Sequence, residues 1–156
     1  MTHQAELYYA SKEYLDSQKW SYHENLSEYR IDFTMNLKSK LSSCKVIVHA
    51  KEKGIFCLAV SPVKANPNQM LSVVEYITRA NYGLLRGNFE IDYRDGEIRY
   101  KTFLNSVNIV PDIDDIGWTI DIGFLMLEKY GDGLLKNIMG FGNPEQDIAE
   151  AEAEQN

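Results

Sequence analysis

The sequence holds few of the residues and motifs on which metal binding, disulfide formation and covalent catalysis depend. Its 156 residues include two cysteines and three histidines, without the His-x-x-x-His or Cys-x-x-Cys spacing that is typical of metal sites. It has no Gly-x-Ser-x-Gly nucleophile motif and no glycine-rich phosphate-binding loop. We therefore expect no metal, no cofactor and no enzymatic activity.

Basic residues and long apolar runs are also scarce. The chain has 16 Lys and Arg against 23 Asp and Glu, so its formal net charge is −7 and its pI is about 5.0. A nucleic-acid-binding protein needs a basic footprint, and this balance predicts no such partner. No apolar run reaches the roughly 18 residues of a membrane helix, and residues 1–6 do not resemble a secretory signal. We expect a cytoplasmic protein, without a membrane partner, whose Cys44 and Cys57 are reduced thiols.

Three segments have the apolar spacing of helices. Asn66 before Pro67, and Asp112 after a proline, are expected N-caps of the second and third helices. Glycine favours helix ends and bends, so Gly131 and Gly133 are expected to kink or break the third helix. The predicted helices span residues 2–17, 66–83 and 112–139.

The remaining patterns predict strands. Residues 29–37 and 45–50 alternate between apolar and polar side chains, as half-buried strands do. Residues 55–60 are apolar on both faces, so we expect them at the centre of the sheet or under a helix. With a later hairpin, the order is helix, three strands, helix, two strands, helix. This order predicts an α+β fold, in which helices pack on an antiparallel sheet.

The hairpin around Asp95-Gly96 is the clearest local signal. Asp-Gly between two alternating runs predicts a two-residue turn. That turn would place Ile91 opposite Tyr100, and Tyr93 opposite Ile98. One face of the hairpin would then be aromatic and aliphatic, and the other would carry three pairs of opposite charges.

The segment from Arg86 to Lys101 resembles the central signature of the YbjN-type domain, whose fold is similar to that of type III secretion chaperones. The resemblance is specific in Gly87-Asn88-Phe89-Glu90 and in Asp95-Gly96-Glu97-Ile98 with Tyr100. The order of elements agrees over residues 21–139. The resemblance implies the same α+β fold, a homodimer, and a non-enzymatic role in binding other proteins, as a chaperone or a regulator.

We expect one domain over residues 1–140 and a disordered acidic tail over residues 141–156, where acidic residues and Glu-Ala repeats predominate. The aromatic residues near the N-terminus either pack on the sheet or form a partner-binding surface. Tyr8, Tyr14 and Trp118 are the candidate exposed contacts for a protein partner. The alternative function is a small-molecule-binding or enzymatic domain, with a cavity between the third helix and the sheet lined by Trp118 and Phe124.

Overall fold

The computed structural model describes residues 1–153 and confirms the predicted α+β fold. Two short segments were not predicted as elements: strand β1 and a single turn of 3-10 helix at Leu26–Glu28. The first turn of the predicted second helix, Pro67–Gln69, is a 3-10 turn. The main elements, in chain order, are α1 (His3–Ser17), β1 (His23–Asn25), β2 (Arg30–Asn36), β3 (Ser43–Lys51), β4 (Gly54–Val60), α2 (Met70–Asn81), β5 (Asn88–Ile91), β6 (Ile98–Asn105), α3 (Ile113–Met139) and α4 (Pro144–Ala153).

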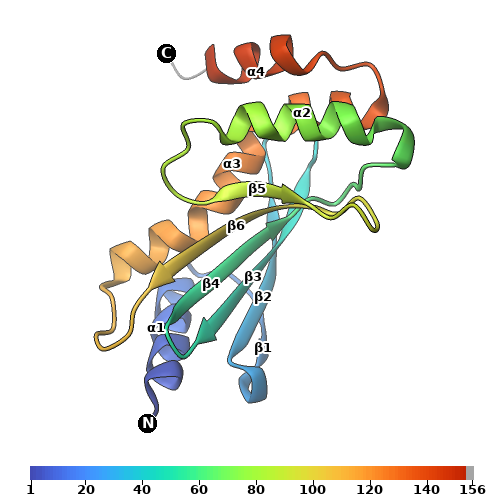
Figure 1. The fold of residues 1–156 in the computed structure, drawn as a ribbon. Helices are drawn as coiled ribbons and strands as arrows, with labels where there is room; N and C mark the ends of the chain where they lie inside the picture. The colour runs from blue at the N-terminus through green and yellow to red at the C-terminus, as the bar shows by residue number, and fades with distance from the viewer. Residues whose placement is uncertain (154–156) are drawn as a thin grey trace.

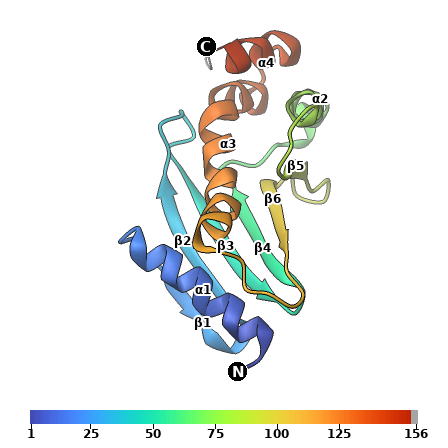
Figure 2. The ribbon, with the colours of Figure 1, turned by 90° about the vertical axis from the view of Figure 1, so that its left-hand side faces the viewer.

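The strands form one antiparallel sheet in the order β1-β2-β3-β4-β6-β5. The strand that is apolar on both faces, β4, lies between β3 and β6, which confirms its predicted central position. Helices α1 and α3 cover one face of the sheet (Figures 1 and 2). Helices α2 and α4 pack with α3 at one end of the sheet, and the other face is left open (Figure 1).

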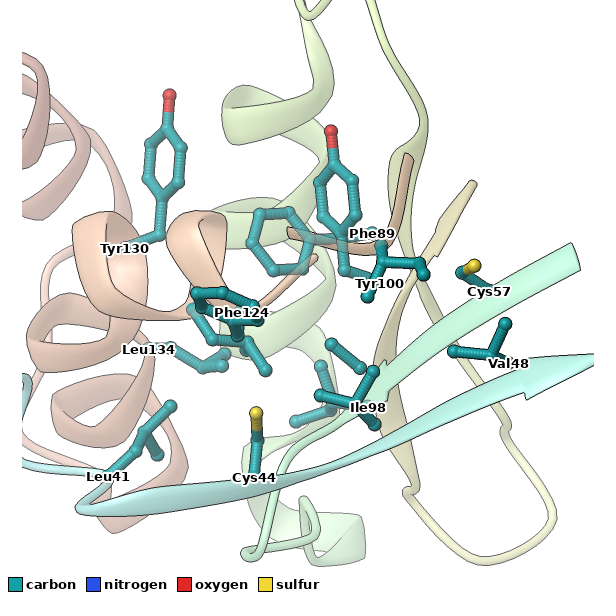
Figure 3. Packing of buried hydrophobic residues seen from close by; sticks show 14 of the residues in the cluster. Leu41, Cys44, Val48, Cys57, Phe89, Ile98, Tyr100, Phe124, Tyr130 and Leu134 are labelled. Atoms are coloured by element: carbon teal, nitrogen blue, oxygen red, sulfur yellow. The ribbon is translucent and has the colours of Figure 1, made fainter. Parts of the chain in front are cut away.

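The core lies between the sheet and α3, where aromatic rings from both layers meet. The buried Phe89 ring packs edge to face against Tyr100 at 4.9 Å and against Tyr130 at 5.7 Å, centroid to centroid (Figure 3). Burying one large apolar side chain stabilises a fold by roughly 1.5–3 kcal/mol. The hydroxyl of Tyr76 donates to the carbonyl oxygen of Tyr130 at 2.6 Å, so its burial leaves no unmet donor.

The predicted hairpin is present, but its predicted register is wrong by two residues. Ile91 lies opposite Ile98 rather than Tyr100, and Tyr93 is in the loop with 66 % of its surface exposed. The loop is longer than two residues because Gly96 packs on another segment. Its carbonyl accepts from the Ala65 N–H at 2.9 Å, and a Cβ on Gly96 would overlap the Ala65 carbonyl oxygen. A shift of two keeps each side chain on its predicted face.

The predicted break in the third helix is also wrong, since α3 is continuous from Ile113 to Met139. A Cβ on Gly131 would overlap the hydroxyl of Ser39, and a Cβ on Gly133 would lie 2.5 Å from the hydroxyl of Tyr76. These two glycines therefore allow neighbouring segments to approach α3 closely. That close packing outweighs the cost of placing glycine inside a helix, about 1 kcal/mol for each residue.

The tail over residues 141–156 was predicted to be disordered, but Pro144–Ala153 form helix α4, which packs on the rest of the fold. Residues 154–156 of the predicted tail lie outside the described part of the chain. The Asn143 side chain caps this helix by accepting from the Gln146 N–H at 3.0 Å. Asp147 is buried and accepts from the Asn137 side chain at 3.0 Å and from the Asn143 N–H at 2.8 Å. These bonds and the buried Ile148 hold α4 against α3.

Candidate protein-binding edge of the sheet

Two of the three side chains predicted to be exposed contacts are buried. Tyr8 is 1 % exposed and Tyr14 is 8 % exposed. The Tyr8 hydroxyl donates to the Glu24 carboxylate at 2.6 Å, and the Tyr14 hydroxyl donates to the Asp121 carboxylate at 2.6 Å. The prediction is wrong for both because α1 is packed on two sides, with the Tyr14 ring filling the space beside Gly117 on α3. Burial, and then these carboxylates, raise the pKa of both phenols, so they act as neutral donors.

Trp118 on α3 is the predicted contact that the structure leaves accessible, with 55 % of its surface exposed. Other large apolar side chains are exposed on the segments near this part of α3. Leu85 is 98 % exposed in the loop before β5, whereas Phe103, 53 % exposed on β6, directs its side chain to the face of the sheet opposite α3. A concentration of exposed apolar side chains is typical of an interaction surface, and the backbone of β6 beside it is open to a partner as well.

The outer side of β6 is only half paired. β5 pairs with it as far as Lys101, and the remaining residues of the strand have no neighbour on that side among the described residues. The Ser106 N–H donates to the Lys53 carbonyl at 2.8 Å, which places the even-numbered residues of β6 in hydrogen-bonded pairs with β4. Because antiparallel pairs alternate, Phe103 and Asn105 direct their backbone N–H and C=O groups outward.

A groove of about 420 Å³ lies along this unpaired half of β6. At one end of it is Gly87, which has a positive φ of 72° and approaches β6 so closely that a Cβ would overlap the Lys101 carbonyl oxygen. One wall is α3 and the other is the loop before β5. The lining residues are Leu85, Arg86, Gly87, Thr102, Phe103, Leu104, Asp115, Thr119 and Ile122.

The outer side of β5, in contrast, is closed by a side chain. The Phe89 N–H donates to the Asn81 side-chain oxygen at 2.7 Å, and the Asn81 amide donates to the Phe89 carbonyl at 3.0 Å. The amide of Asn81 thus makes the two bonds that a residue of a further strand would make. No added strand can pair at Phe89 while Asn81 occupies that position.

The opposite edge of the sheet has a second unpaired half, on β2 beyond β1. The Leu37 N–H donates to the Ser42 carbonyl at 2.8 Å, so the odd-numbered residues of β2 pair with β3, and Thr34 and Asn36 face outward. The hollow beside them, about 320 Å³, is smaller than the β6 groove, so it leaves less room for the side chains of a partner segment. Its lining residues are Ser21, Tyr22, His23, Asp32, Phe33, Thr34 and Lys45.

The residues with catalytic or metal-binding potential are dispersed. Burial raises the pKa of the Cys44 and Cys57 thiols to about 12 each, so neither is a ready thiolate. Over residues 1–153, no three His, Cys, Asp or Glu side chains are grouped to hold a metal ion. In the same range, no helix has the length and apolar character needed to span a membrane.

The alternative site, a cavity lined by both Trp118 and Phe124, does not match the positions of these side chains. Phe124 is 8 % exposed and packs against the Trp20 ring at 5.9 Å, on the core side of α3. Trp118 points to solvent. Beside Phe124, a Cβ on Gly123 would lie 2.8 Å from the Ala59 side chain, so α3 and the sheet are in close contact there.

Comparison with known proteins gives no relative: no family model, no curated protein and no solved structure matches this chain.

Proposed function

We propose that the protein is a non-enzymatic protein-binding module that captures an extended segment of a partner along the unpaired half of β6. The observation that carries this proposal is the combination of outward-facing backbone groups at Phe103 and Asn105 with a groove beside them whose lining mixes apolar and polar side chains. An extended peptide binds a sheet edge through main-chain hydrogen bonds, and pockets for alternate side chains give specificity.

The geometry allows an estimate of the binding energy. Phe103 and Asn105 offer two N–H donors and two C=O acceptors, and each hydrogen bond contributes about 0.5–1.5 kcal/mol net. An apolar partner side chain buried in the groove against Leu85 and Ile122 contributes about 1.5–3 kcal/mol. Immobilising the peptide costs several kcal/mol, so we expect affinities in the micromolar range for a short segment.

The groove also indicates the chemistry of the captured segment. An extended segment directs alternate side chains to opposite faces, so every second residue faces the groove and should be apolar. Arg86 and Asp115 lie among the lining residues, and they provide one charge of each sign for polar flanking residues. The partner is thus an extended segment with alternating apolar residues and mixed charge.

The resemblance of residues 86–101 to the YbjN-type domain supports the same proposal and extends it. The secretion-chaperone-like fold implies a homodimer with a chaperone or regulatory role, and we propose these for this chain as well. Sedimentation velocity on the purified protein tests the dimer: a single species at the monomer mass would contradict it.

The strand-addition proposal is tested with two proline variants and a displayed peptide library. Asn105→Pro removes an outward N–H on β6 and leaves the β4 pairing intact, because Asn105 does not bond to β4. Thr34→Pro is the matched control, since it removes an outward N–H on the open half of β2. Peptides selected on the wild type should bind Asn105→Pro at least tenfold more weakly and Thr34→Pro with unchanged affinity.

A Leu85→Ala variant serves as an independent check on the position of the groove, because Leu85 lines it, and it should weaken the same peptides severalfold. Thermal melting of each variant verifies that it is folded. If selected peptides bind Asn105→Pro as tightly as the wild type, the β6 edge is not the binding site and the proposal is wrong.

A further inference from the structure

The face of the sheet that α1 and α3 leave open carries a row of three ring side chains. The register places Phe56 directly opposite Phe103 on one side and opposite His49 on the other. All three belong to the positions that alternate away from the core, and Phe103 is more than half exposed. Figure 1 looks onto this face, where β3, β4 and β6 lie side by side.

The Phe103 ring is exposed on this face and reaches across to the neighbouring strand. A Cβ built on Gly54 would come within 2.8 Å of the tip of the Phe103 ring, so the ring extends over the bare backbone of Gly54 on β4. Because glycine has no side chain, the tip of the ring can approach the sheet surface there, and more than half of the Phe103 surface is exposed. Such a ring can stack on a planar group of a ligand.

Basic side chains surround the row. The alternation of the four longest strands, β2, β3, β4 and β6, puts five basic side chains and Asp32 on the open face, with Asp32 3.9 Å from Arg30, and β5 adds Glu90. Lys45 and Lys51 are exposed, while Arg99 and Lys101 share the Glu90 carboxylate of β5. The five basic residues are Arg30, Lys45, Lys51, Arg99 and Lys101.

The charge of this face is opposite to that of the whole chain. The protein has a net charge of −7, and further acidic side chains, Asp92 and Glu97, lie at the hairpin end of the sheet with Arg94. The remainder of the open face has a local excess of positive charge. Electrostatic attraction of a ligand depends on the local distribution of charge more than on the total.

These features discriminate among possible occupants. A second copy of the chain would bring two basic faces together, which like-charge repulsion disfavours. An acidic polypeptide would neutralise the basic side chains, but it has no need of a row of rings. A single-stranded nucleic acid matches both the basic side chains and the rings, because its phosphates pair with the former and its unpaired bases stack on the latter.

We propose that the open face of the sheet binds single-stranded nucleic acid, with bases on Phe56 and Phe103 and phosphates on the surrounding Lys and Arg side chains. A duplex keeps its bases stacked inside, so it cannot use the rings and should bind more weakly. This binding is separate from peptide capture, which uses the outward backbone of β6 rather than the side chains of the open face.

The proposal is tested by fluorescence anisotropy with labelled RNA and DNA single strands of about 12 nucleotides and with the matching duplex. The wild type should bind single strands saturably at low salt and the duplex at least tenfold more weakly. Phe103→Ala should lose about tenfold in affinity, and Phe103→Tyr should retain it because the ring is kept. Tyr82→Ala, in the loop between α2 and β5, removes a 92 % exposed ring elsewhere and should bind as the wild type does.

The basic side chains are tested by the salt dependence of the same titration. Lys45→Ala combined with Lys51→Ala should lower the slope of log affinity against log salt by about 1.4, because each lysine is expected to neutralise one phosphate and each phosphate of a single strand contributes about 0.7. Absence of binding at low salt overturns the proposal, and so does equal affinity for duplex and single strand. Polyglutamate that competes as well as the oligonucleotide would show that the face binds acidic polypeptides instead. The Asn105→Pro variant should bind nucleic acid normally, which separates this outcome from peptide capture.

Discussion

Asn81 closes the outer edge of β5, and removing its side chain has a cost that can be worked from the geometry. In Asn81→Ala, the Phe89 N–H loses its 2.7 Å acceptor, and the Phe89 carbonyl loses one of its two side-chain donors, keeping that of Asn88 at 3.0 Å. An unmet, part-buried backbone donor costs about 1–3 kcal/mol. We therefore expect the free energy of unfolding to fall by about 1–3 kcal/mol, which lowers Tm by about 2–12 °C in a chain of this size.

Urea denaturation and thermal melting measure this change, and two variants serve as controls. Asn88→Ala removes the exposed second donor to the same carbonyl and should cost less than about 0.5 kcal/mol. Asn81→Asp keeps the acceptor for the Phe89 N–H and should fall between the two. If Asn81→Ala and Asn88→Ala were equally stable, the bond from the Phe89 N–H would contribute nothing measurable. The exposed edge should also promote self-association, which size-exclusion chromatography would detect as larger species.

Two further predictions concern a glycine and a histidine. Gly96→Ala should destabilise the fold by more than about 2 kcal/mol, because the new side chain would combine a positive φ of 81° with overlap on Ala65. Gly83→Ala is the control: Gly83 has a φ of 88° but open space around it, so the substitution should cost about 1 kcal/mol. Equal losses of stability in chemical denaturation would refute the role of the Ala65 contact. His49 has a lowered pKa, through burial and then the charge of Lys51, so the unfolded chain binds more protons than the folded one below about pH 6.5 and stability falls on acidification. His49→Gln should flatten that fall between about pH 7 and pH 5, and an unchanged pH profile would contradict it.

Local sequence signals predicted the ends of elements well where a single side chain, such as an N-cap, determines the local backbone geometry. Asn66 before Pro67 correctly predicted a helical start, with the Asn66 side chain accepting from the Gln69 N–H. The same pair occurs at Asn143-Pro144, where it caps α4, but the acidic composition that follows predicted disorder instead. The cap and the apolar Ile148 were the available signal for that helix, and composition obscured it.

Features that depend on contacts between distant segments were beyond local patterns. The hairpin register shifted because Gly96 packs on Ala65, which is 31 positions away in the chain. Tyr8 and Tyr14 looked like spare aromatic residues on one helix, yet neighbours on two sides bury them. The net charge predicted the absence of a basic surface, although strand alternation collects basic side chains on one face. The net charge of a whole chain does not show how its charged side chains are distributed among the faces of the fold.

The glycines of α3 also determine how ligands meet the protein. Gly117, Gly123, Gly131 and Gly133 each admit a neighbour that a methyl group would displace, and these neighbours come from α1, β4, the loop after β2, and α2. A helix held this closely from several directions cannot slide or rotate without steric overlap at every one of them. The wall that α3 gives to the β6 groove is therefore rigid before any partner arrives. Capture of an extended segment should proceed in a single kinetic phase, at an association rate that rises linearly with peptide concentration and shows no plateau from a slow internal rearrangement.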